Sequence, residues 1–117
     1  MKVLKEHHDG VTLLTLKGEF DSFVCAGFTQ EVAAIQAEGV HQLVLNLRLV
    51  KFINSTALGA MIKARKACRA AGGEVVISHP SPAVREAMES LGLDRLFTIH
   101  DDDEAAIAAL GGGQAGE

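Results

Sequence analysis

Short apolar runs typical of β-strands alternate along this chain with segments that have the period of a helix, and this alternation limits the fold more than any other feature. After an opening pair of strands, each strand is followed by a helix. Such an order favours right-handed crossovers and a mixed, largely parallel sheet with helices packed against it. The sequence therefore predicts an α/β fold with strands at 2–8, 11–17, 41–50, 74–79 and 96–100, and about four helices, at 22–38, 55–71, 82–92 and 101–110.

Small and polar residues mark the ends of these segments. Asp9-Gly10 supplies the positive φ angles of a two-residue hairpin, so the first two strands are expected to be antiparallel. We expect Gly18 to end the second strand and Asp21 or Ser22 to cap the first helix. The apolar residues that recur near helical spacing in that helix are Phe23, Phe28, Val32 and Ile35.

The later segments carry signals of the same kind. The run at 41–50 is rich in Leu and Val and is typical of a strand buried on most sides, so we expect it to be the central strand. Ser81 is expected to cap a helix that begins at Pro82, where a missing N–H costs nothing. The acidic residues at 101–103 are expected to form a solvated cap at the positive end of the last helix.

The length and charge of the chain limit the classes of function. A chain of 117 residues suits one domain, predicted at 1–110 and followed by a flexible tail at 111–117. The net charge of -4 argues against direct nucleic-acid binding. No signal peptide or apolar membrane span is visible, so we expect a cytoplasmic protein without membrane insertion.

The sequence does not contain the motifs of common enzyme classes. A P-loop and a dinucleotide-binding glycine motif are both missing, and the five histidines lack metal-ligand spacing. Ser55 lacks the elbow motif of a serine nucleophile. We therefore expect no catalytic residue, no metal and no cofactor. Cys25 and Cys68 are read as small buried thiols.

The helix at 55–71 carries four basic residues. A solvated helix face, with aliphatic stems covering the edge of the core, is favoured over a docking surface for an acidic partner. These residues are Lys63, Arg65, Lys66 and Arg69.

The stretch FINSTALG, at 52–59, places three polar residues directly between an apolar strand and a helix. Asn54 or Ser55 is expected to cap the helix, which stabilises it by about 1 kcal/mol. Capping justifies one polar residue, but it does not explain three in a row. Nor does it explain the acidic pair Glu19 and Asp21 at the matching earlier junction.

Taken together, several segments resemble a STAS domain of the anti-sigma factor antagonist family. They are KGEFD (17–21), VLNLR (44–48), FINSTALG (52–59), the Gly-Gly before EVVIS (72–78) and SPAVREAMESLGLDRLF (81–97). The resemblance covers residues 3–110. FINSTALG is its most specific part, because it is similar to the family signature of two apolar residues followed by Asp-Ser-Ser/Thr-Gly-Leu-Gly.

The resemblance implies a role for the residues of this signature. Ser55 would be the phosphoacceptor, with Thr56 as the hydroxyl beside it and Asp21 as the acidic residue close to it. The phosphosite environment and partner surface would also include Asn54, Ala57, Leu58 and Gly59. The implied partners are an anti-sigma factor with a serine kinase fold, which phosphorylates the chain, and a PP2C-type phosphatase, which reverses the modification.

Two residues depart from the signature, and two other functions therefore stay open. Asn54 replaces Asp and Ala57 replaces Gly, so both charge and backbone freedom change beside the acceptor. The first alternative is a STAS interaction subunit of a transporter or scaffold assembly without sigma-factor control. The second is a nucleotide-binding domain. Self-association through the open sheet edge of the N-terminal hairpin is also compatible with the sequence.

Overall fold

The computed structural model describes residues 1–111. Its elements follow the predicted order, with a short 3₁₀ helix, η1, added before the last strand. They are β1 (Lys2–His8), β2 (Val11–Phe20), α1 (Cys25–Ala37), β3 (Gln42–Ile53), α2 (Ser55–Ala70), β4 (Glu74–Ser78), α3 (Pro82–Ser90), η1 (Leu93–Arg95), β5 (Ile99–His100) and α4 (Asp103–Ala109).

The strands form one mixed sheet in the order β1-β2-β3-β4-β5. β1 and β2 are antiparallel, and the other neighbours are parallel. Asp9 and Gly10 have φ angles of 48° and 85°, which the predicted hairpin turn requires. The middle position of β3 confirms the prediction of a central strand at 41–50.

The strands β2 and β3 both run further than predicted. Gly18 does not end β2: it has a φ angle of 108°, and pairing with β3 continues to Phe20. Register shifts on both sides of Gly18 allow this, because a bulge absorbs a left-handed residue without ending the strand. β3 continues to Ile53, the pairing partner of Phe20. The two strands therefore end side by side.

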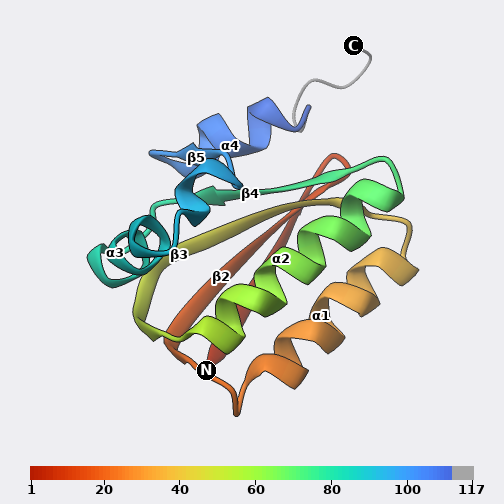
Figure 1. Cartoon of the computed structure of the whole chain (residues 1–117). Helices are drawn as coiled ribbons and strands as arrows, with labels where there is room; N and C mark the ends of the chain where they lie inside the picture. Colours follow the sequence, from red (N-terminus) through yellow and green to blue (C-terminus); the bar gives the residue numbers. More distant parts are fainter. Residues whose placement is uncertain (112–117) are drawn as a thin grey trace.

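Helices cover both faces of the sheet (Figure 1). α1 and α2 lie side by side over one face, and α4 lies over the other. The main core fills the space under α1 and α2 and extends to α3, with Phe20, Phe28, Leu45 and Met61 among its fully buried side chains. A smaller apolar cluster joins α4 to the sheet: Val11, Leu13, Val44, Val76 and Ala106.

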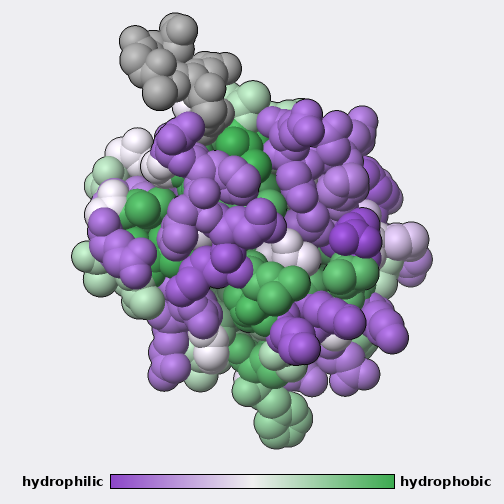
Figure 2. Space-filling model, turned by 180° about the vertical axis from the view of Figure 1, so that it is seen from behind, coloured by the Kyte–Doolittle hydropathy of each residue, from purple (hydrophilic) through white to green (hydrophobic). Residues whose placement is uncertain are grey.

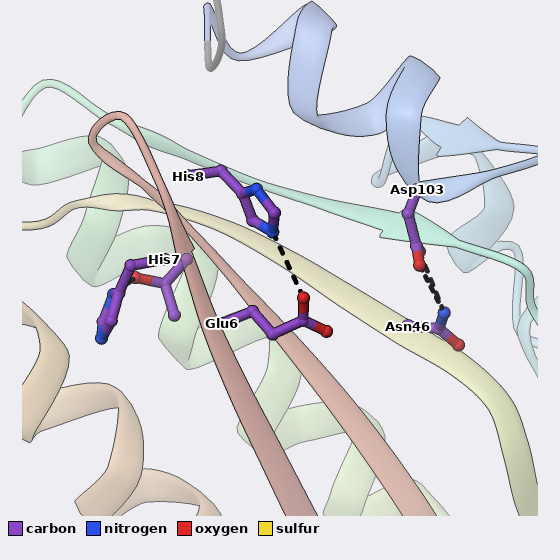
Figure 3. Close-up of polar contacts among 6 residues, drawn as sticks. Glu6, His7, His8, Asn46 and Asp103 are labelled. Carbon is purple, nitrogen blue, oxygen red and sulfur yellow. Dashed lines mark hydrogen bonds and ion pairs between the residues drawn. The ribbon is translucent and has the colours of Figure 1, made fainter.

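Polar contacts also hold α4 on the sheet. Asn46 is 2% exposed, and its Nδ2 donates to Asp103 Oδ1 at 2.9 Å (Figure 3). Ser78 Oγ donates to the same carboxylate. Asp102 is the helix cap and accepts from Ala105 N. The predicted acidic cap is thus confirmed for Asp102, whereas the Asp103 side chain turns inward to satisfy two buried polar groups.

The segment between α3 and α4 differs from the prediction. α3 begins after its predicted cap Ser81, whose Oγ accepts from Val84 N, but it ends at Ser90 and not at Gly92. The strand predicted at 96–100 forms only at Ile99–His100. Leu93 O accepts from the backbone N–H groups of the two residues that follow η1, so they remain in a turn.

Two further predictions concern membrane insertion and the C-terminal tail. Among the helices of residues 1–111, none is long and apolar enough to cross a membrane. The tail predicted at 111–117 lies, after Gly111, outside the described residues.

Candidate functional site

The junction between β3 and α2 contains the polar residues that the sequence singled out. Asn54 has extended backbone angles and is the N-cap of α2, with its Oδ1 accepting from Ala57 N at 2.9 Å. Asn54 O accepts from Leu58 N and starts the helical hydrogen bonds. Asn54, one of the two predicted candidates, therefore does the capping.

Capping by Asn54 leaves the next hydroxyl group free for another use. Ser55 is the first residue of α2, and both Ser55 and Thr56 are exposed. Neither side chain makes a hydrogen bond within residues 1–111. A hydroxyl here is accessible, and it lies at the positive end of a 16-residue helix, where a negative charge is favoured.

Two further residues of the signature turn inward, and one stays partly accessible. Ala57 and Leu58 are 0% and 2% exposed and belong to the main core. Gly59 is half-buried, and a Cβ added there would meet nothing within 4 Å. Ala57 and Leu58 therefore hold the start of α2 in the core, while Ser55 and Thr56 are accessible.

The junction between β2 and α1 has a different construction. Asp21 Oδ1 accepts from Phe23 N at 3.0 Å, and Asp21 O accepts from Val24 N at 3.2 Å. In this local turn the side-chain and backbone oxygens of Asp21 are already occupied, so they are not available to cap a helix. α1 consequently begins at Cys25, after Val24 and without a side-chain cap. The predicted capping by Asp21 or Ser22 was therefore wrong.

Phe23 is the residue that the prediction misplaced most. It was expected on the buried face of the first helix, but it precedes that helix and its side chain is 94% exposed. Phe28, Val32 and Ile35 are buried as predicted. The signal that sequence reasoning missed is the Asp-Ser-Phe order itself, since Asp commonly bonds to the backbone N–H two residues later.

Two hydrogen bonds join the junctions. Asn54 N donates to Phe20 O at 3.3 Å, and Asn54 Nδ2 donates to Ser22 Oγ at 3.2 Å. One amide side chain therefore caps α2 and also holds the turn that carries Phe23. The structure thus brings the turn containing Asp21 to the start of α2, and within residues 1–111 no hydrogen bond joins Asp21 to Ser55.

The β2–α1 and β3–α2 junctions together form a corner, and a shallow groove of about 390 Å³ lies beside it, between α1 and α2. Its lining includes Cys25, Thr56, Gly59 and Lys63. Thr56 and Gly59 thus extend the accessible surface of the corner toward α1.

The predicted basic face of α2 is partly used within the chain. Arg65 Nε lies 3.1 Å from a carboxylate oxygen of Glu74, and the Arg65 guanidinium lies over Phe97. Arg69 contacts the other oxygen of Glu74 at 2.7 Å. The predicted solvated face is exposed at Lys63, Lys66 and Arg69, whereas Arg65 is largely shielded from solvent by these contacts.

The two cysteines are free, and their surroundings differ. Cys68 is buried, as predicted, and burial, with the Glu74 charge as a second cause, raises the pKa of its thiol to about 11. Cys25 is only half-buried and donates from Sγ to Asp21 O. Burial and then the Asp21 charge raise the pKa of Cys25. A raised pKa disfavours the reactive thiolate form of both cysteines.

Comparison with known proteins identifies the family. The model of the STAS domain matches residues 2–106. The chain belongs to the STAS domain family. An anti-sigma F factor antagonist of Paenibacillus polymyxa is 28% identical to this STAS chain over 111 residues, which cover 94% of this chain and 95% of that protein.

Solved structures give the same result for the fold. An anti-sigma factor antagonist from Mycobacterium paratuberculosis matches this STAS chain with a TM-score of 0.83 at 26% identity, covering 94% of this chain and 93% of that one. The anti-sigma factor antagonist SpoIIAA matches in its unphosphorylated form with a TM-score of 0.78 at 19% identity, covering 94% and 97%. The Bacillus SpoIIAA structure in the phosphorylated form gives 0.72 at 18% identity, covering 92% and 99%. The predicted STAS fold is confirmed.

Proposed function

We propose that this STAS chain is an anti-sigma factor antagonist that binds an anti-sigma factor with a serine kinase fold. In this proposal the partner phosphorylates Ser55, the modified chain no longer binds, and a PP2C-type phosphatase restores the binding form. The chain itself is a binding protein and not an enzyme. The names of its relatives support the antagonist function.

One observation carries the regulatory part of the proposal. Asn54 satisfies the capping position of α2, so Ser55 keeps an exposed hydroxyl at the helix N-terminus that has no structural task. A helix cap that was also the phosphoacceptor would couple modification to helix stability. Here the two tasks belong to different residues, and Ser55 is available for modification alone.

The physical effect of phosphorylation follows from this position. A phosphate adds roughly -1.5 to -2 charges. The positive end of α2 tolerates this charge, so the fold is expected to persist. A partner surface fitted to a neutral hydroxyl must instead desolvate a dianion, and a cost of about 3 kcal/mol already weakens binding roughly a hundredfold. No change in the shape of the chain is needed.

Residues near Ser55 have defined tasks in this proposal. Thr56 and Gly59 form the accessible surface beside it, and Asn54 fixes the two junctions relative to each other. Asp21 contributes by holding Phe23 outside the helix. The proposal places the chain in the cytoplasm, where a kinase has access to ATP.

Purified components provide the test. The chain is incubated with ATP and each kinase-fold anti-sigma protein encoded in the same genome, and the phosphorylated residue is mapped by mass spectrometry. We expect one phosphate on Ser55, none in Ser55→Ala, and unchanged modification in Thr56→Ala. Titration calorimetry then compares the modified and unmodified chains. Absence of phosphorylation and binding with every such protein would favour a STAS subunit of a transporter or scaffold.

A further inference from the structure

The outer edge of β1 is not paired with any strand in residues 1–111, because β1 is the first strand of the sheet. From the residues on this edge we infer that it is a self-association surface, on which β1 strands from two copies pair antiparallel with Leu4 opposite Leu4. An unpaired edge offers a row of backbone donors and acceptors to another strand. The side chains determine which strand fits it.

The two faces of β1 have different surroundings. Val3 packs against the main core, and Lys5 Nζ contacts Glu31 of α1 at 3.3 Å, so both lie on the side of α1 and α2. Since side chains alternate along a strand, Lys2, Leu4 and Glu6 share the opposite face. Figure 3 shows Glu6 with His8, which it contacts at 3.5 Å, and His7 pointing away from them.

Leu4 is the apolar centre of this opposite face of β1. It is 54% exposed, and its partner across the hairpin is Thr15, which buries little of it. Figure 2 shows this side of the molecule, where hydrophobic surface lies among hydrophilic residues. A second Leu4, placed across the free edge, would cover the remaining surface with an apolar side chain.

The charge sequence of β1 selects one register. With Leu4 opposite Leu4, the antiparallel arrangement also places Lys2 of each copy opposite Glu6 of the other, and so forms two unlike charge pairs on one face. Registers centred on Lys5 or Glu6 place like charges opposite each other. A register centred on Val3 forms no charge pair at all. Among the registers centred on Val3 to Glu6, the edge therefore fits a second copy of itself in one alignment.

The hairpin itself supplies a reason for Lys2 to need a carboxylate. Lys2 is paired with Lys17 in the β1–β2 register, and like charges directly opposite each other are destabilising. No ion pair within residues 1–111 involves either lysine. Glu6 of the second copy would lie beside Lys2 and relieve this repulsion. The resulting dimer is expected to be weak and to weaken further with salt.

Site-directed cross-linking tests the register. Cys25 is replaced by Ser, and Leu4→Cys and Glu6→Cys are compared with dibromobimane, a short bifunctional thiol reagent, with dimer read by intact mass. We expect cross-linked dimer for Leu4→Cys and at least tenfold less for Glu6→Cys, because the two Glu6 positions would lie about 14 Å apart. Equal yields, or no dimer for Leu4→Cys, would overturn the proposal.

A charge exchange tests the energetic part without added thiols. Sedimentation equilibrium is measured for the wild type, Lys2→Glu, Glu6→Lys and the double variant, with circular dichroism as the folding control. Each single change is expected to raise the dimer dissociation constant about tenfold, since every unfavourable pair occurs twice in a symmetric dimer. The double variant should return close to wild type. A wild type that stays monomeric, or a double variant without recovery, contradicts the inference.

Discussion

The two strand-to-helix junctions lie side by side, yet they solve the same structural problem differently. After β3, one extended residue, Asn54, caps α2 with its side chain, and the helix begins at once. After β2, Asp21 closes a local turn first, and α1 begins later without a side-chain cap. The direct cap leaves the Ser55 hydroxyl free, whereas the turn leaves an aromatic ring outside the core. The difference leaves an exposed hydroxyl group at one junction and an exposed apolar ring at the other.

The largest expected effect tests whether Ser55 is special among the exposed serines of the two junctions. Ser55→Asp should weaken binding to the proposed kinase-fold partner about a hundredfold, because in the complex a charge would replace a neutral, desolvated hydroxyl. Ser22→Asp places a charge in the other junction and should weaken it less than about tenfold. Titration calorimetry with both variants checks this. Equal losses would mean that the interface responds to any charge at this corner.

The exposed ring of Phe23 provides the next prediction. Phe23→Ala should weaken partner binding about tenfold or more, because aromatic anchors supply much of the energy of protein interfaces. The free energy of unfolding should change by less than about 0.5 kcal/mol, since the side chain is 94% exposed. Leu91→Ala, which removes another exposed apolar side chain on the α3 side of the molecule, is the matched control. A loss of stability without a loss of affinity would return Phe23 to a structural role.

The same contrast shows how far the sequence could determine the structure. The order of elements and the capping of α2 followed from local signals, because Asn54 Oδ1 and the backbone N–H of Ala57 that donates to it are only three residues apart. The role of Asp21 was ambiguous in the sequence, because an Asp side chain can either cap a helix or bond to the backbone of a turn that begins with it. Asp103 lacked any local signal: its partners Asn46 and Ser78 lie 57 and 25 residues away.

Capping variants should separate the two junctions by stability. Asn54→Ala removes the side-chain cap and is expected to lower the free energy of unfolding by about 1 kcal/mol. Asp21→Ala breaks a turn that caps no helix, so its cost should be about half as large or less. Urea titrations of both variants measure the difference, and Asn54→Asp, which keeps a capping oxygen, is the control. An equal cost at both positions would mean that the Asp21 turn stabilises α1 as effectively as a cap.

The smallest effect concerns the thiols on the two helices that begin at these junctions. Burial, with the Glu74 charge as a second cause, raises the pKa of the Cys68 thiol from 9.0 to about 11 in the folded chain. Above pH 9.0 the unfolded state therefore binds fewer protons than the folded state. The free energy of unfolding must therefore fall as pH rises from 9.0 to about 11, and by about pH 9.2 it should be lower by about 0.5 kcal/mol.

A Cys25→Ser background isolates the effect of Cys68, and urea titrations at several pH values measure how the free energy of unfolding changes with pH. Cys68→Ala is expected to be less stable at every pH because of the cavity, but to lose this part of the slope. If Cys68→Ala loses stability with pH as steeply as the wild type, the titration belongs to another group. Cys68 would then contribute to stability only as a buried apolar side chain of α2.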